Sequence, residues 1–346
     1  MRQDTPIRLR LLADDLTGAL DSAARFVPLT GPIATTWRTD PSPHQSVAID
    51  TATRDLSAAD AATAIAHFAP LLDSGEPAFK KIDSLLRGHV AVELAACMRR
   101  FDHCILAPAF PFQHRITRGG RQLVRAQDAW RDTGVDLQAA LRAQGIDLRP
   151  RDAETDADLD AIVAEGRALS GRVLWCGTGG LAGALAGHLP VAKPNLPGPI
   201  LALIGSDHPV SAIQLAAASH LHMPLPQSDI TRVAQRLKHG SAAVTVDLPA
   251  TTPRDTARRT ITAHFTALLQ AIDRPGTLFV TGGETLRHLC DALHVTHLDV
   301  DGEIEPGAPT SILRGGDWDG QRLVSKSGAF GDGQFLQRLL HTANVL

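Results

Sequence analysis

The sequence predicts an α/β fold of two domains, each with a mainly parallel sheet. Short apolar runs alternate with amphipathic helical runs along all 346 residues, an order typical of βαβ units. A chain of this length exceeds the usual size of one domain. The proline-rich segment 190–199 disfavours both helix and strand and separates two such patterns. The expected domains are therefore 1–190 and 198–346.

In the N-terminal half, each predicted strand ends in polar residues and is followed by a helix. Ile7 to Leu12 is apolar and stops at two carboxylates, after which a 3.6-residue spacing begins at Leu16. Asp15 or Thr17 is placed to cap this helix. Further strands are expected at 46–49, 78–82, 103–107 and 172–176, and further helices at 57–72 and 90–101.

The C-terminal half repeats the alternation of strands and helices after the proline-rich segment. Its expected strands are 200–204, 243–246, 277–280 and 322–325. Its expected helices are 209–219, 254–272, 284–293 and 332–341. The pattern indicates a second α/β domain.

Composition and charge exclude several classes of protein. A net charge of −3 and a pI near 6.6 give no electrostatic reason to expect nucleic acid or an anionic membrane as a partner. No apolar run approaches the roughly 20 residues needed to span a bilayer, and the N-terminus lacks a signal-peptide pattern. The four cysteines are scattered without metal-ligand spacing, so reduced thiols and a cytoplasmic location are expected.

Polar and charged residues gather at four predicted strand ends of the N-terminal half. They are Asp14 and Asp15; Thr53 and Arg54; Lys81, Asp83, Ser84 and Arg87; and Arg115 and Thr117. The carboxyl ends of parallel strands lie along one sheet edge, so these groups are expected to converge. Arginine grips carboxylates with two hydrogen bonds, and Asp and Ser bind hydroxyls, so the pattern favours a hydroxy acid. Polar loop ends that merely face solvent are the alternative.

The C-terminal half has glycine-rich turns at 204–207, 280–285 and 325–333, each between a predicted strand and helix. Glycine lets backbone N–H groups approach phosphate, and a helix N-terminus favours negative charge. None of the turns matches the P-loop or the dinucleotide-binding pattern. Three in one domain predict a nucleotide site, whereas a single one would be read as a tight turn.

Five separate motifs resemble the four-carbon acid sugar kinases, in the order of that family. They lie at 13–19, 80–88, 108–111, 281–285 and 326–331. The resemblance implies an N-terminal domain that binds a sugar acid, a C-terminal domain that binds ATP, and both ligands in a cleft between the domains. It implies phosphorylation of the terminal hydroxyl of threonate, erythronate or 3-oxotetronate, with the isomer left open.

The resemblance also carries site residues onto this chain. Substrate contacts fall on Asp14, Arg54, Lys81, Ile82, Asp83 and Ser84. Nucleotide contacts fall on Ser206, Gly282, Gly283, Glu284, Thr285 and Gly328.

A kinase mechanism assigns further roles. Mg²⁺-ATP is expected on the glycine turns, with Lys326 facing its phosphates, and Arg54, Lys81 or Arg87 is expected to meet the substrate carboxylate. The catalytic candidates are Asp14, Asp83 and Arg87. Asp14 is the predicted acceptor of the hydroxyl proton, with Asp83 or Asp332 as alternatives.

Three residues depart from the family pattern, and other functions stay open. Leu85 stands at a usual threonine, and His114 and Ala329 stand at usual glycines. A non-catalytic relative that binds a sugar acid or a nucleotide is the main alternative. A metal-dependent phosphatase is a further one, although the adjacent Asp14 and Asp15 miss its D-x-D spacing. The sequence leaves a homo-oligomer open.

Overall fold

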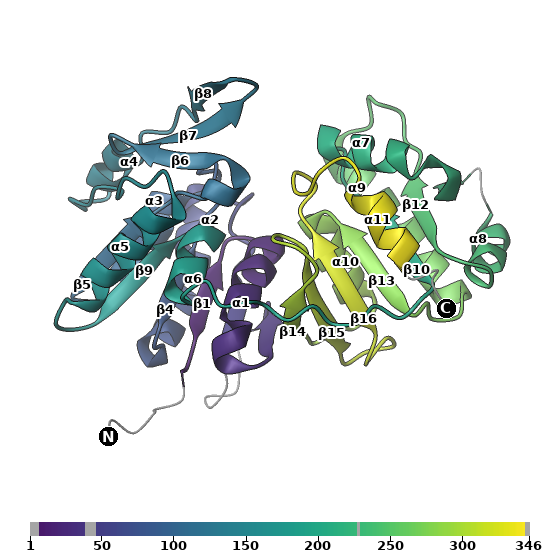
Figure 1. Ribbon diagram of the computed structural model, residues 1–346, viewed down its shortest axis with the longest axis horizontal. Helices are drawn as coiled ribbons and strands as arrows, with labels where there is room; N and C mark the ends of the chain where they lie inside the picture. Colours follow the sequence, from purple (N-terminus) through teal and green to yellow (C-terminus); the bar gives the residue numbers. More distant parts are fainter. Residues whose placement is uncertain (1–6, 39–45, 227–228, 343–346) are drawn as a thin grey trace. The chain divides into compact units, whose positions relative to one another are not determined.

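The computed structural model describes residues 7–38, 46–226 and 229–342. The chain forms two compact units, Met1–Val191 and Ala192–Leu346, and the division falls inside the proline-rich segment 190–199 (Figure 1). The strands and helices of each unit are described separately below.

The first unit is built on a parallel sheet. In sheet order its strands are β2 (Ile33–Thr36), β3 (Val47–Asp50), β1 (Arg10–Ala13), β4 (Ala78–Lys81), β9 (Val173–Gly177) and β5 (His103–Ala107). Every neighbouring pair runs parallel. The central strands are buried along their whole length, as expected where helices cover both faces of a parallel sheet.

Two groups of helices pack on this sheet. The first group consists of α1 (Leu16–Thr30), α5 (Asp156–Arg167) and α6 (Gly179–Leu185), in which α6 contacts both α1 and α5. The second consists of α2 (Ala58–Phe68), α3 (Val90–Met98) and α4 (Leu137–Ala143), whose apolar residues share one core with the strands. Short 3₁₀ turns follow α2 and β5, η1 (Ala69–Ser74) and η2 (Pro111–Gln113).

A small antiparallel sheet lies in the chain after β5. It consists of β6 (Arg115–Arg118), β7 (Arg121–Ala126) and β8 (Ala129–Asp132). We did not predict these strands, because their many charged residues break the apolar alternation that marks a strand.

The second unit has a mixed sheet. In sheet order its strands are β11 (His222–Leu225), β12 (Ala242–Val246), β10 (Ile200–Ile204), β13 (Thr277–Thr281), β16 (Arg322–Lys326), β15 (Pro309–Arg314) and β14 (His297–Glu303). The strands from β11 to β16 are parallel, and β15 and β14 are antiparallel to their neighbours. Its helices are α7 (Pro209–Ala217), α8 (Ile230–Leu237), α9 (Arg254–Ala271), α10 (Gly283–Ala292) and α11 (Phe335–Thr342), with the 3₁₀ turn η3 (Ser219–Leu221) after α7.

The mainly parallel α/β class is confirmed. Each predicted strand corresponds to an observed strand, although the first, predicted at 7–12, is Arg10–Ala13. The helix predicted at 57–72 is helical to Phe68 and then continues as a 3₁₀ turn. Besides β6, β7 and β8, the strands and α-helices without a counterpart in the prediction are β2, β11, β14, β15, α4, α5 and α8. Within the described residues, no helix has both the length and the apolar character needed to cross a membrane.

The strand order places a ligand-binding edge in each unit. After β1 the chain moves toward β2, and after the adjacent β4 it moves the other way, toward β9 and β5. After β10 the chain likewise moves toward β11, whereas after the adjacent β13 it moves toward β14. Parallel sheets bind ligands outside the carboxyl ends of strands at such reversals. The expected edges are therefore the ends of β1 and β4, and of β10 and β13.

Candidate active site

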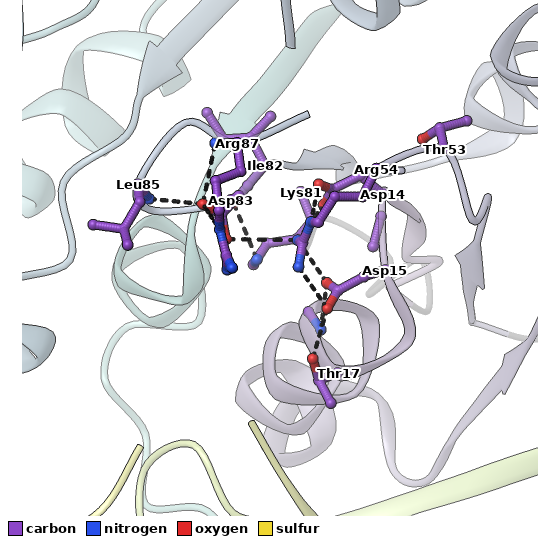
Figure 2. Close-up of polar contacts among 12 residues, drawn as sticks. Asp14, Asp15, Thr17, Thr53, Arg54, Lys81, Ile82, Asp83, Leu85 and Arg87 are labelled. Atoms are coloured by element: carbon purple, nitrogen blue, oxygen red, sulfur yellow. Dashed lines mark hydrogen bonds and ion pairs between the residues drawn. The ribbon is translucent and has the colours of Figure 1, made fainter. Parts of the chain in front are cut away.

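Arg54 gathers three carboxylates at the carboxyl ends of β1, β3 and β4 (Figure 2). Its Nε and Nη2 donate to the two oxygens of Asp14 at 2.7 and 2.9 Å. Nη2 also donates to Asp15 Oδ1 at 2.8 Å and lies 3.7 Å from Asp83 Oδ1. The structure thus brings together groups from three of the predicted strand ends.

Asp15 rather than Thr17 caps helix α1. Its Oδ1 accepts from the Gly18 N–H at 3.0 Å, and its Oδ2 accepts from the Thr17 hydroxyl at 2.7 Å. A Cβ at Gly18 would stand 2.5 Å from Asp15 Oδ1 and 2.8 Å from Lys81 Nζ. The glycine therefore lets the Lys81 ammonium lie against the first turn of α1.

Asp83 organises the turn that follows β4. Its Oδ2 accepts from the backbone N–H groups of Leu85 and Arg87, and its two oxygens accept from Arg87 Nε and Nη2 at 3.0 and 2.7 Å. Gly88, with φ +82°, closes this turn beside Asp14 and Arg54. The Arg87 side chain is 61% exposed, so one guanidinium of the cluster is open to solvent.

The remaining predicted substrate residues lie around this cluster. Ser84 is buried, and its hydroxyl accepts from Arg115 Nη1 at 2.6 Å. The Ile82 side chain belongs to the core, and its carbonyl accepts from Lys81 Nζ at 3.0 Å. Thr117 was predicted to join the site, but its hydroxyl instead donates to Gln122 inside the β6–β7 pair.

A buried ion pair that we did not predict lies beneath the cluster. Lys80 Nζ is 2.6 Å from Glu93 Oε2, and both side chains are almost fully buried. Lys80 also donates to the Lys81 carbonyl at 2.8 Å, and Glu93 accepts from the Thr53 hydroxyl at 2.8 Å. Thr53 was predicted to face the ligand, but its hydroxyl instead forms part of this network. Thr51 continues the network from Thr53 to the Ala13 carbonyl.

The network joins the ends of the three strands to helix α3. A sequence signal for it existed, because successive strand residues point to opposite faces and Lys80 precedes Lys81. One of the two lysines had to enter the core and find a carboxylate partner.

The three aspartates of the cluster have different electrostatic environments. Burial raises the pKa of Asp14, and the opposing effect of Arg54 does not cancel it. For Asp15, Arg54 and Lys81 outweigh burial, so the pKa is lowered. For Asp83, hydrogen bonds from Arg87 and the charge of Arg54 outweigh burial and hold the pKa well below its usual range. Asp14 is therefore the carboxyl group of the three that is closest to exchanging a proton.

In the second unit, the three glycine-rich turns follow the adjacent strands β10, β13 and β16 and touch one another. A Cβ at Gly205 would stand 2.1 Å from Thr285 Oγ1, and a Cβ at Gly328 would stand 1.9 Å from Ser206 Oγ. Gly282 has φ +100° and donates to the Lys326 carbonyl at 3.0 Å. The structure thus brings the predicted nucleotide residues of the three turns together.

The N-terminus of helix α10 is suited to an anion. Gly282 is its N-cap and supplies no side-chain acceptor, so the first-turn N–H groups of Gly283 and Glu284 have no side-chain cap. Such a helix N-terminus favours phosphate through its free N–H groups and its dipole. The Glu284 carboxylate is directed instead to Arg254 and Arg258, 3.4 and 3.5 Å away. The turns therefore fit the phosphate groups of a nucleotide.

Lys326 does not lie as we predicted. Its ammonium donates to the carbonyls of Ser327 and Phe330 at 2.9 and 2.8 Å, so it braces the third glycine turn from within. Burial lowers the pKa of Lys326 to about 8. Ser211 and Gln214 of α7 hold the same turn from the other side, through the carbonyls of Gly328 and Phe330.

Ala329 and His114, the two residues that stand at positions of usual glycines, differ in backbone strain. The φ angle of Ala329 is not positive, so an alanine adopts this conformation without strain. His114 has φ +53° and ψ +45°, a left-handed conformation that disfavours side chains.

We expect His114→Gly to raise the free energy of unfolding by about 0.5–1 kcal/mol, because the exposed imidazole is replaced by a residue that adopts this conformation freely. Chemical denaturation measures the change. Gln113→Gly is the matched control, because Gln113 has no positive φ and should lose stability. Equal effects of the two variants would contradict strain at His114.

Comparison with known proteins gives a separate match for each half of the chain. Residues 9–136 match the model of a sugar-binding N-terminal domain, and residues 233–336 match that of a nucleotide-binding C-terminal domain. Two crystal structures share the fold across 96% of this chain and 98% of their own. One is from Salmonella typhimurium LT2 (TM-score 0.71, 21% identity), and the other is a Haemophilus influenzae DUF1537 protein (TM-score 0.67, 18% identity).

The chain therefore combines one domain of the sugar-binding type with one of the nucleotide-binding type. A D-threonate kinase from Cupriavidus necator is 30% identical over 93% of this chain and 94% of its own. A D-threonate kinase from Bordetella bronchiseptica is 27% identical over 95% of each chain. The chain belongs to the four-carbon acid sugar kinase family.

Proposed function

We propose that the protein transfers the γ-phosphoryl group of ATP to the terminal hydroxyl of a four-carbon sugar acid, with D-threonate as the first candidate. The observation that carries the proposal is the cluster of Asp14, Asp15, Arg54 and Asp83 at the strand ends where the chain reverses direction. It offers carboxylates for hydroxyl groups and the guanidinium group of Arg54 for a carboxylate. The names of the two relatives suggest the same substrate class.

The residues of the first unit would hold the acid. The exposed guanidinium of Arg87 is the most accessible group for the substrate carboxylate, with Arg54 and Lys81 behind it. Ser84, Asp83 and the Ile82 carbonyl line the same turn. Asp14 would orient the reacting hydroxyl and take its proton, because burial raises the Asp14 pKa toward that of an effective base.

The two other predicted bases fit this role less well. Asp83 is held as a carboxylate by Arg87 and the backbone of its own turn. Asp332 is exposed in the second unit and pairs with Arg338 at 2.8 Å. Both have a lowered pKa, Asp83 through Arg87 and Arg54 and Asp332 through Arg338.

The turns of the second unit would hold ATP. The proposed contacts are the backbone N–H groups of Gly283 and Glu284, together with Gly282, Ser206, Thr285 and Gly328; the N–H of Gly282 itself donates to the Lys326 carbonyl. In the described residues, no group of three His, Cys, Asp or Glu is arranged to hold a metal ion. Mg²⁺ bound mainly through phosphates needs few protein ligands, so this site fits Mg²⁺-ATP; the ion would neutralise charge on the phosphoryl group.

ADP formation from Mg²⁺-ATP, measured against the stereoisomers of threonate, erythronate and 3-oxotetronate, tests the proposal. We expect turnover with one acid well above the ATP-only rate. Asp14→Asn should lower kcat by about 10²-fold or more, whereas the control Asp332→Asn should leave it unchanged. Near-normal turnover of folded Asp14→Asn would refute the base. Saturable binding of an acid without turnover would point to a binding protein, and phosphate release without ATP would point to a phosphatase.

A further inference from the structure

Asp21, in the second turn of helix α1, is a buried carboxyl group that the predicted site did not include. The residue is 5% exposed, and its Oδ1 has no hydrogen-bond partner among the described residues. Its Oδ2 lies 2.6 Å from the point where a Cβ of Gly179 would stand, so the carboxyl group fills the space left by that glycine. A buried acceptor without a donor is rare in a folded protein and calls for an explanation.

The carboxyl group lies beside the cations of the acid site. Asp21 follows Gly18 by three residues and therefore lies on the same face of α1, the face against which the Lys81 ammonium rests. Lys81 of β4 and Arg115 of β6 both act electrostatically on Asp21, as does Arg25 one turn further along α1. Asp15 is the acidic neighbour. Burial is the largest effect and raises the pKa of Asp21 despite these cations.

The contrast with Glu93 shows that Asp21 is not a structural carboxylate of the ordinary kind. Both groups are almost fully buried in the same unit. Glu93 is matched by the Lys80 ammonium at one oxygen and by the Thr53 hydroxyl at the other. Among the described residues, Asp21 Oδ1 has no such partner, so its burial lowers the free energy of unfolding of the ligand-free protein. Groups that cost stability in this way are concentrated at functional sites.

We propose that Asp21 is a substrate-binding residue that accepts a hydrogen bond from a non-reacting hydroxyl of the sugar acid, between Lys81 and Arg115. The inference rests on the proposed function and adds a specificity determinant to it. Lys81 and Arg115 supply donors to the oxygens of a polyhydroxy acid, and Asp21 supplies the acceptor that its hydroxyl proton needs. A site built to bind a hydroxyl discriminates strongly against an analogue that lacks it, because its polar group then stays buried without a partner.

The test compares Asp21→Ala, Asp21→Asn and the control Ser22→Ala. Ser22 is the next residue of α1, and its buried hydroxyl also has no hydrogen-bond partner within the described part of the chain, but it points about 100° away around the helix. We expect Asp21→Ala to raise the KM for the acid at least tenfold while leaving the KM for ATP unchanged. Asp21→Asn, which keeps an acceptor oxygen, should show a smaller rise. Ser22→Ala should leave both values unchanged.

Two further measurements separate binding from structure. Without ligands, Asp21→Ala should unfold at a temperature equal to or above that of the wild type. Wild-type enzyme should prefer the tetronate to its 2-deoxy or 3-deoxy analogue, and Asp21→Ala should lose most of that preference. A lower unfolding temperature with an unchanged KM would overturn the proposal and make Asp21 structural.

Failure of the proposed function would be recognised separately. If the wild type phosphorylates no tetronate, calorimetric titration of the same acids without ATP decides the matter. Weaker acid binding by Asp21→Ala than by the wild type would then support the inference. Equal affinities, or binding by neither protein, would overturn it. Turnover by the wild type with an unaltered KM in Asp21→Ala would overturn the inference while leaving the proposed function standing.

Discussion

Glu93→Ala is expected to lower the free energy of unfolding by about 3–5 kcal/mol. The substitution removes the carboxylate 2.6 Å from Lys80 Nζ and leaves a fully buried ammonium without its counter-charge. Glu93 and Asp14 together raise the pKa of Lys80 despite its burial, so Lys80 is charged in the native protein. The Thr53 hydroxyl would lose its acceptor as well. Urea denaturation followed by circular dichroism measures the loss.

The double variant Lys80→Met/Glu93→Leu is the control for this interpretation. Replacing both charges with apolar groups of similar size removes the unpaired ammonium, so most of the lost stability should return. Its activity is expected to stay below that of the wild type, because the network also positions the ends of β1, β3 and β4. A loss below about 1 kcal/mol for Glu93→Ala would show that water or another group replaces the carboxylate.

Gly328→Ala is expected to lower kcat/KM for ATP by about 10²-fold, the effect of displacing a binding group by about 1 Å. The new Cβ would stand 1.9 Å from Ser206 Oγ and 2.8 Å from Ser206 Cβ. Rotation of the hydroxyl removes the first overlap but not the second, so one of the two turns must move. Steady-state kinetics with varied ATP, at a saturating concentration of the acid, measures the effect.

Ala329→Gly is the matched control for the third glycine turn. It restores the residue usual in the family at a position without positive φ, so kcat/KM for ATP should change less than twofold. The KM for the acid should stay unchanged in both variants. A Gly328→Ala enzyme with wild-type kinetics would show that the contact between Ser206 and Gly328 does not hold the nucleotide turns in place.

The sequence missed the parallel strands β2 and β11 but was sufficient to predict the other parallel strands and the polar groups at their ends. Each of these strands combines an apolar run with a change to helical spacing, and both signals are local. Strands β14 and β15 were missed, although Leu298 and Val300 alternate with Asp299 and Asp301 in the two-residue pattern of a half-buried strand. The short, charged strands β6 to β8 carry no comparable signal.

The pairing of charged side chains in the site could not be predicted from the sequence. Arg54 and Arg87 were predicted as cations for the substrate, but their partners Asp14 and Asp83 depend on how close the strand ends come. Asp21 resembles any polar helix residue until the packing of Gly179 shows that it is buried. Lys326 illustrates the same limit, because a lysine in a glycine turn can point outward or inward with equal local sequence support.

The carboxylates around Arg54 have a consequence for selectivity among anions. Asp14 and Asp15 already act as its counter-ions, so an incoming anion must displace an internal carboxylate rather than fill a bare positive pocket. Chloride or inorganic phosphate gains little from such an exchange, because it offers the released aspartate few or no donors. A polyhydroxy acid supplies both groups that this exchange needs: a carboxylate that binds the guanidinium and hydroxyl groups that donate to the released aspartate. The cluster would therefore respond to the two groups together and discriminate against abundant simple salts.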